Sequence, residues 1–262
     1  MDVAIRLPVA LVGAVLCCGD ASWAEEQAAC KDCWDGPEMF EHRSPFNPGA
    51  LAIAATEIGA LPGRPLAFWM TPVVGLPCEG CEAVFVGMPK KLESAARIAP
   101  PGEAGEAMLI TGRVLDAAGK PRANVIVYAY HTDASGIYPP PAQSLGAAAD
   151  RHGRLRGWAV TDRGGRYSFT TIRPASYPGR RIPAHVHMHV IEPGCATYYI
   201  DEIVFTDDPL LTPAERGQHQ AHRAGSGITT PRRDGAGKPW RVERDIRLGL
   251  NIPGHPGCPP AN

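Results

Sequence analysis

Three histidines occupy alternate positions in one short segment, as His185, His187 and His189. Successive side chains of a β-strand point to opposite faces, so these imidazoles are expected to share one face while Val186 and Met188 pack on the other. Neighbouring same-face side chains start about 7 Å apart, so two imidazoles can converge on one ion. The pattern outlines a metal site, although a histidine pair alone also fits the solvent-facing side of an ordinary strand.

Two tyrosines upstream of the histidines are further candidates. Tyr138 lies in the loop 133–141, whose glycine and prolines forbid a regular strand, and Tyr177 is followed by Pro178. Either tyrosine alone fits a loop residue that bonds to nearby backbone. Together with the histidines, a metal-binding role is favoured.

The order of these motifs resembles the intradiol ring-cleavage dioxygenases, the family of protocatechuate 3,4-dioxygenase and catechol 1,2-dioxygenase. The similarity covers residues 111–210 and depends on the joint pattern, since any one fragment would be weak. Besides the Tyr138 loop, the matching segments are Gly112-Arg113-Val114-Leu115-Asp116, Gly119-Lys120-Pro121, Arg156-Gly157, Thr161-Asp162, Tyr167-Ser168-Phe169, Tyr177-Pro178 and Pro183-Ala184-His185-Val186-His187.

The resemblance implies a mononuclear non-haem Fe(III) held by Tyr138, Tyr177, His185 and His187. It also implies an activity, the O₂-dependent opening of a catechol-type aromatic diol to a muconate-type diacid. Tyr177 matches the tyrosine that the diol displaces and that accepts a substrate proton. Phenolate is a hard anionic donor that favours trivalent iron, whereas imidazole does not discriminate among metals. His189 matches no family role and is expected in the core or behind the ligands.

The sequence departs from the family pattern at two places. Ile182 stands where the best-known members carry an arginine, so Arg180 or Arg181 is expected to supply positive charge to the bound substrate. Glu202 stands near a family glutamine. A carboxylate beside an anionic diol is unfavourable unless it is protonated, paired or turned away.

Two other functions remain open from the sequence. The segments 111–121 and 161–169 also resemble carboxypeptidase-regulatory-like domains, which are non-catalytic β-sandwich modules without the histidine pair or the second tyrosine loop. An exported metal-binding protein that keeps the iron site without turnover is the third possibility.

Composition supports a single folded β domain with extensions. The chain has 262 residues, of which 44% are hydrophobic and 20% charged, and its 29 glycines and 27 prolines favour short strands and turns. We predict an all-β fold, an antiparallel β-sandwich with a loop-rich N-terminal extension and short helices. Strands are expected at 107–115, 124–131, 166–172, 184–191, 197–205 and 242–248, with a β-hairpin over 156–174 and helix starts at 51 and 212.

The segment 1–24 has the features of a secretory signal peptide, which predicts a periplasmic or secreted protein without a membrane span in the mature chain. The remaining divisions are an N-terminal extension and linker (25–105), the dioxygenase-like sandwich (106–250) and a tail (251–262). A net charge of -1 gives no basic field for nucleic acid, and the oligomeric state is left open.

The cysteines of the mature chain suit an oxidising compartment. Disulfides are the expected state, with Cys195 and Cys258 as candidate partners. The two Cys-x-x-Cys pairs, 30/33 and 78/81, are the alternative, because together they could build a tetrahedral zinc site.

Overall fold

The structure is a computed structural model of the chain. Contacts divide the chain into two units, of which the second comprises residues 49–262. Residues 71–78, 80–219 and 222–259 are described, and all belong to the second unit. The predicted signal segment, the predicted helix at 51–59 and the 30/33 cysteine pair lie outside the described residues. The boundaries of the four segments given above stay predictions.

The described part of the chain is mostly β-structure with short helices, which confirms the all-β prediction. Its elements in chain order are η3 (Cys81–Ala83), β1 (Ala95–Arg97), β2 (Ala107–Leu115), β3 (Ile126–His131), α3 (Ala147–Arg151), β4 (Arg156–Val160), β5 (Arg166–Ile172), β6 (His185–Glu192), β7 (Ala196–Phe205), α4 (Pro213–Gln218), β8 (Ile228–Thr229), β9 (Trp240–Glu243) and β10 (Ile246–Arg247). Among these residues no helix combines the length and apolarity needed to cross a membrane.

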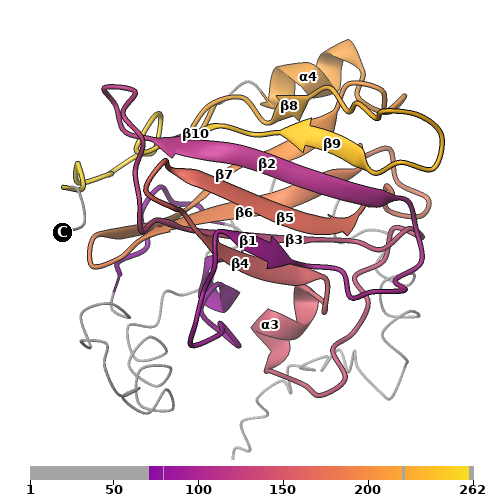
Figure 1. Cartoon of the computed structure of the whole chain (residues 1–262), viewed down its shortest axis with the longest axis horizontal. Helices are drawn as coiled ribbons and strands as arrows, with labels where there is room; N and C mark the ends of the chain where they lie inside the picture. Colours follow the sequence, from indigo (N-terminus) through magenta and orange to yellow (C-terminus); the bar gives the residue numbers. More distant parts are fainter. Residues whose placement is uncertain (1–70, 79, 220–221, 260–262) are drawn as a thin grey trace, which may run out of the picture. The chain divides into compact units, whose positions relative to one another are not determined.

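The strands form two sheets, which we call the β2 sheet and the β6 sheet (Figure 1). The β2 sheet has the order β1-β5-β2-β10, with β9 also paired to β2, and the β6 sheet has the order β4-β3-β6-β7-β8. The pairs β2–β5, β3–β4, β3–β6 and β6–β7 are antiparallel, as expected. The pairs β1–β5, β2–β9, β2–β10 and β7–β8 are parallel, so each sheet is mixed.

Residues from both sheets form one hydrophobic core. Met108 and Ile110 of β2 and Phe169 of β5 belong to the same buried cluster as Val186 and Met188 of β6. Side chains alternate along a strand, so His185, His187 and His189 of β6 must face away from this core. The fold therefore directs the candidate ligands to the outer face of the β6 sheet.

The predicted hairpin over 156–174 is wrong. β4 pairs with β3 in one sheet, whereas β5 pairs with β1 and β2 in the other. The turn between them is tight, with the Asp162 carboxylate accepting hydrogen bonds from the amides of Gly164 and Arg166 at 2.8 Å. The turn itself was predicted correctly. The two strands diverge because they bury their aromatic side chains in different places. Those of β5 lie in the core between the sheets, whereas Trp158 of β4 belongs to the cluster outside the β6 sheet.

The predicted strand at 242–248 is divided into β9 and β10. The interruption lies at Arg244, which is 1% exposed and donates hydrogen bonds to several backbone carbonyls, among them that of Gly225 at 2.9 Å. Its own carbonyl approaches Gly112 so closely that a Cβ there would lie 2.0 Å away. The Arg244 amide still donates to the Thr111 carbonyl of β2 at 2.8 Å, but the next β2 amide, that of Arg113, donates to the Asp245 carboxylate at 2.8 Å and not to a backbone carbonyl, which interrupts the ladder.

Two further predictions are confirmed. Helix α4 begins after Thr212, whose hydroxyl accepts a hydrogen bond from the Glu215 amide at 3.2 Å. Cys195 and Cys258 form a disulfide with an S–S distance of 2.05 Å, which joins the chain end to the turn between β6 and β7.

Candidate metal centre

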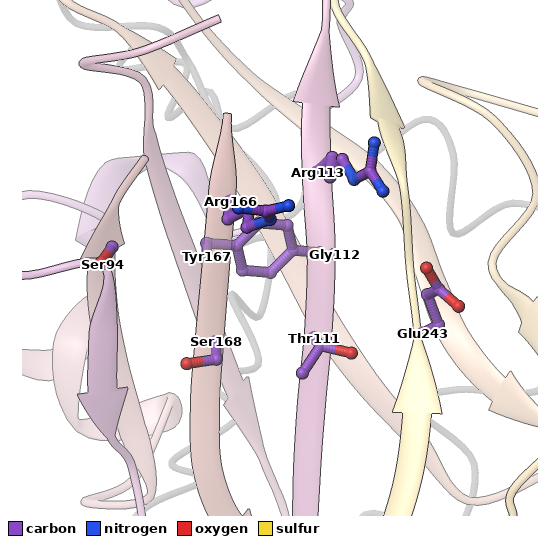
Figure 2. Close-up of a pocket in the computed structure, with 8 residues that line it drawn as sticks. All are labelled: Ser94, Thr111, Gly112, Arg113, Arg166, Tyr167, Ser168 and Glu243. Atoms are coloured by element: carbon purple, nitrogen blue, oxygen red, sulfur yellow. The ribbon is translucent and has the colours of Figure 1, made fainter. Parts of the chain in front are cut away.

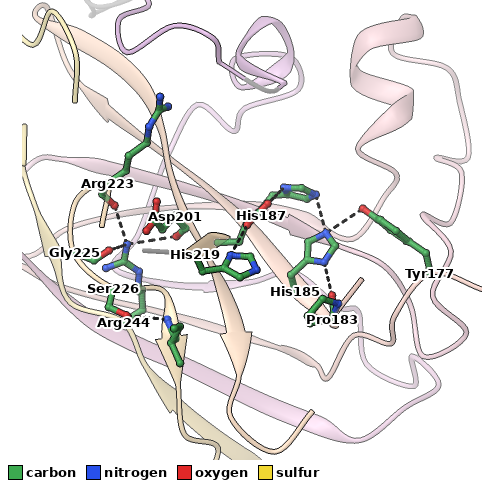
Figure 3. Close-up of polar contacts among 12 residues, drawn as sticks. Tyr177, Pro183, His185, His187, Asp201, His219, Arg223, Gly225, Ser226 and Arg244 are labelled. Carbon is green, nitrogen blue, oxygen red and sulfur yellow. Dashed lines mark hydrogen bonds and ion pairs between the residues drawn. The ribbon is translucent and has the colours of Figure 1, made fainter. Parts of the chain in front are cut away.

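His185 is held at the start of β6 by backbone contacts on both sides. The Ala184 amide donates to the Asp208 carboxylate at 2.7 Å, and His185 Nδ1 lies 2.8 Å from the Pro183 carbonyl oxygen. A carbonyl can only accept, so Nδ1 carries a proton, and in the tautomer protonated there Nε2 presents a lone pair. Figure 3 shows this ring between Pro183 and Tyr177.

Tyr138 is positioned by the loop 133–141, which is held closed by the side chain of Asp133. The Asp133 carboxylate accepts hydrogen bonds from the backbone amides of Ser135 (2.8 Å) and Ile137 (3.2 Å). The Ala175 amide donates to the Asp133 carbonyl at 3.1 Å, which ties this loop to the segment that carries Tyr177. Two loops far apart in the sequence are thus joined beside β6.

Gly136 permits the close approach of these two loops. It adopts a φ of +83°, and a Cβ at this position would lie 2.0 Å from the Ser176 carbonyl oxygen. Glycine alone combines the left-handed conformation with the missing side chain. The glycine of the 133–141 loop therefore has a steric role at the site.

The four predicted ligands come together with their donor atoms in a closed ring. Tyr138 Oη lies 2.7 Å from Tyr177 Oη, and Tyr177 Oη lies 3.0 Å from His185 Nε2. His185 Nε2 lies 3.2 Å from His187 Nε2, which in turn lies 2.9 Å from Tyr138 Oη. Ligands about 2.0–2.1 Å from one ion and at right angles to each other would lie about 2.9 Å apart. The spacing of all four neighbouring pairs fits a shared ion.

The chemistry of the donor set also fits a cation of high charge. His187 directs Nδ1 toward Glu202, so the tautomer protonated there presents a second Nε2 lone pair 3.2 Å from that of His185. Burial, followed by the neighbouring His185 ring, lowers the pKa of His187 well below its usual range, so the ring is neutral at pH 7. Two facing lone pairs repel unless a cation lies between them, and two phenolate oxygens favour a hard trivalent ion.

Glu202 lies behind His187, on the ring edge opposite the four-atom cluster. Its carboxylate oxygens lie 3.5 Å from His187 Nδ1 and 3.5 Å from His219 Nδ1, at the end of α4. His185, His187 and Glu202 form a possible metal-binding group by distance alone. The orientation of His187 argues otherwise, since its Nε2 points to the tyrosines and its Nδ1 to the carboxylate. The carboxylate is thus turned away from the four donor atoms, which is one of the arrangements that the sequence analysis allowed.

Sequence reasoning missed the aromatic wall of this site. Tyr130 of β3 stacks on His187 with ring centroids 4.5 Å apart, and its ring also lies 3.8 Å from His152, parallel to within 4°. Burial, followed by the charges of His189 and Arg156, lowers the pKa of His152 to about 3. The alternation of tyrosines in the predicted strand 124–131 was the available signal. No local sequence pattern indicated that His152 or His219 would lie close to the candidate ligands.

Arg180 and Arg181 follow Tyr177 in a turn closed by a hydrogen bond of 3.2 Å from the Arg180 amide to the Tyr177 carbonyl. Arg180 is partly buried and Arg181 is exposed, as is Ile182, at 38% of its surface. The turn therefore holds the backbone of Arg180 against that of the candidate ligand Tyr177, and Arg181 is the next residue. Their contribution to substrate charge stays a prediction.

A shallow pocket of about 320 Å³ lies elsewhere, on the outer face of the β2 sheet. Figure 2 shows its polar lining, with Arg113 and Arg166 on adjacent strands and Glu243 beside them. No group of histidines or tyrosines converges among its lining residues. We take the four-donor cluster as the candidate functional site, because metal chemistry depends on converging donor atoms rather than on open volume.

Comparison with known proteins identifies the family of the chain. A model of the family described as Dioxygenase matches residues 85–219, and the chain belongs to the intradiol ring-cleavage dioxygenase family. The protocatechuate 3,4-dioxygenase beta chain of Burkholderia cepacia is 33% identical over 126 residues, covering 45% of this chain and 54% of the relative. Hydroxyquinol 1,2-dioxygenase of a Rhizobium species is 34% identical over 123 residues, covering 41% of this chain and 40% of the relative.

Among solved structures, catechol 1,2-dioxygenase of Acinetobacter radioresistens has a TM-score of 0.48 and 18% identity, covering 67% of this chain and 62% of that one. The chain spans about half the length or less of the two curated relatives, at 54% and 40%.

Proposed function

We propose that this protein uses one Fe(III), held by Tyr138, Tyr177, His185 and His187, to open the ring of a catechol-type aromatic diol with O₂. The bond between the two hydroxylated carbons breaks, and both atoms of O₂ enter the muconate-type diacid, so no external reductant is needed. The observation that carries the proposal is the closed ring of donor atoms at 2.7–3.2 Å. Family membership supports the same reaction class.

When bound, Fe(III) would supply Lewis acidity and a template for the diol. The chain's own residues would provide the remaining functions. Tyr177 lies on the segment after β5, and its Oη contacts both Tyr138 and His185. As a phenolate held by the cation, Tyr177 would take a proton from a substrate hydroxyl at Oη. Tyr138 and the two histidines would remain as permanent ligands, since His185 and His187 are 8% and 3% exposed.

Glu202 would hold the proton on His187 Nδ1 and so keep Nε2 available as a donor. Metal-binding histidines usually donate their other nitrogen to a carboxylate or carbonyl, which fixes the tautomer and raises ligand basicity. Here the Pro183 carbonyl accepts from His185 at 2.8 Å, and a Glu202 carboxylate oxygen lies 3.5 Å from His187 Nδ1, so a small approach would complete the second contact. The carboxylate at this position thus supports a ligand and has no need to contact the diol.

The test uses the full chain, purified and loaded with iron, and a panel of 1,2-diols of different ring substitution. We expect oxygen uptake and a product whose mass equals diol plus both oxygen atoms, together with a red to brown tyrosinate-to-iron charge-transfer colour. The matched 1,4-diol should not react, because its two oxygens cannot reach one ion. Colour without turnover on any diol would favour a metal-binding protein instead. A colourless protein after iron loading would overturn the ligand assignment itself.

A further inference from the structure

A second cluster of metal-binding side chains lies on the same strand face as the candidate iron ligands. Sγ of Cys78, Sγ of Cys81 and a ring nitrogen of His189 all lie within 4.8 Å of one another. Cys78 is partly buried, Cys81 is 5% exposed and His189 is fully buried. In the structure the two cysteines are joined as a disulfide.

The cysteine loop is anchored beside His189 by contacts that do not involve the disulfide. On its N-terminal side, the Val74 amide donates to the Thr197 carbonyl of β7 at 2.9 Å. On its C-terminal side, the Val84 carbonyl accepts a hydrogen bond of 2.6 Å from Trp158 Nε1 of β4. Both anchors would remain after reduction, so the two sulfur atoms would stay near the imidazole.

The surroundings of the cluster favour a bound cation with thiolate ligands. His189 lies among tyrosine rings, with centroids 5.7 Å from Tyr128 and 5.4 Å from Tyr199. Gly80, between the cysteines, packs so tightly that a Cβ there would lie 2.4 Å from His152 Nε2. Water is largely excluded, and attraction between a thiolate and a cation is stronger in such an environment than in bulk water.

We propose that Cys78, Cys81 and His189 form a zinc site when the disulfide is reduced. The Cys-x-x-Cys spacing and an added histidine are typical of Zn²⁺ ligation, and three protein ligands leave a fourth position for water or another donor. The cysteine pair is then a switch between two covalent states, a disulfide and a zinc dithiolate.

The chemistry of the switch balances with a thiol or phosphine reductant. Two electrons from the reductant, with two protons from the thiol reductant or from water, convert the S–S bond to two thiols, while the reductant is oxidised. Zn²⁺ then replaces the two thiol protons, which pass to solvent. The site needs no iron and does not depend on the proposed ring-cleavage activity.

The experiment titrates Zn²⁺ into the full, iron-loaded chain before and after reduction, with Co²⁺ as a coloured substitute for Zn²⁺. We expect reduction to create one high-affinity site that shows thiolate-to-Co²⁺ absorption. Zinc should also protect Cys78 and Cys81 from alkylation, as mapped by mass spectrometry on the unsubstituted protein. Equal zinc binding in the oxidised and reduced chains, or alkylation of both cysteines at saturating zinc, would overturn the proposal.

Variants separate this site from other thiols. Cys78→Ser with Cys81→Ser should abolish the reduction-dependent site, and His189→Phe should weaken it at least by the 10–100-fold typical of losing a supporting partner. The control pair Cys30→Ser with Cys33→Ser, and Cys258→Ser, should both keep it. Loss of zinc in the Cys30/Cys33 control would show a four-cysteine site and overturn the role of His189. The iron charge-transfer colour reports whether each variant is folded.

Discussion

The two sheets present opposite environments on their outer faces. On the β2 sheet, Arg113, Arg166 and Glu243 are exposed and line an open, shallow pocket (Figure 2). On the β6 sheet, Tyr128 and His187 are at most 3% exposed. The difference arises because Val84, Phe85, Met88 and Leu92 of the segment before β1 pack over that second face.

This difference shows that burial of a sheet face by covering residues, more than the residue types on that face, determines where chemistry can occur. Both outer faces carry polar side chains in strand alternation. On the open face, charges interact through water and are screened. On the covered face, imidazoles and phenols are held at fixed distances, and their attraction for a cation is strong because little water competes.

Loss of a ligand on the covered face should have the largest effect. We expect Tyr138→Phe, His185→Ala and His187→Ala each to lose most bound iron and all measurable turnover, since each removes a direct donor. Tyr177→Phe should retain more iron but lose substrate deprotonation. The controls on the open face, Arg113→Ala and Glu243→Ala, should keep both. Iron content and oxygen uptake provide the measurements, and normal turnover in either histidine variant would place the metal elsewhere.

Removing the nearby positive charge should have the next largest effect. Arg180→Ala is expected to lower turnover by about 10² to 10³, the usual loss when a donor to a developing anion is removed. Arg181→Ala should be mild, because its side chain is exposed whereas that of Arg180 is partly buried. Iron content should be unchanged in both. Wild-type turnover in both variants would show that the charge at the substrate is stabilised by other groups.

Gly136→Ala should disrupt the site without removing any donor. The added Cβ would meet the Ser176 carbonyl at 2.0 Å, so the two tyrosine loops must separate. A displacement of about 1 Å can cost about 10²-fold in turnover. Gly119→Ala is the matched control, since Gly119 has a similar φ of +79° but no atom within 4 Å of its Cβ position. Equal turnover in the two variants would contradict the steric role.

Glu202→Gln should have a smaller effect on iron. The amide can still contact His187 but loses the charge that favours the Nδ1 proton, so we expect iron to bind 10–100-fold more weakly. The energy of the tyrosinate charge-transfer band should also shift, which loss of folding alone would not produce. His219→Asn tests the second contact. An unchanged band and affinity in Glu202→Gln would limit Glu202 to a structural contact.

The smallest effect at neutral pH concerns His131, which lies fully buried between Thr132 and Thr171. Burial lowers its pKa to about 4, below the unfolded value of about 6.5. As pH falls, the His131 imidazole is therefore protonated in the unfolded state before it is protonated in the folded state. The free energy of unfolding decreases between pH 6.5 and pH 4, by up to about 3 kcal/mol. Denaturant unfolding of His131→Gln across this range should show a smaller loss than the unsubstituted chain. The exposed His222, changed to Asn, is the control.

Sequence alone was sufficient for features written in local periodicity. The predicted strands 107–115 and 166–172 agree with β2 and β5, and the shared face of the three histidines follows from alternation along β6. The Thr212 cap and the Asp162 turn depend on neighbouring residues and were equally accessible. The candidate ligands were nominated from motif order, before any distance between them was known.

Only the tertiary structure decided which distant segments meet. It separated β4 from β5, brought Tyr138 within 2.7 Å of Tyr177 across 39 positions, and placed Glu202 behind His187. It also set the Cys78 and Cys81 sulfurs beside His189. These contacts depend on how both sheets bury their apolar faces together, and that balance of packing and chain entropy has no signature within any single segment.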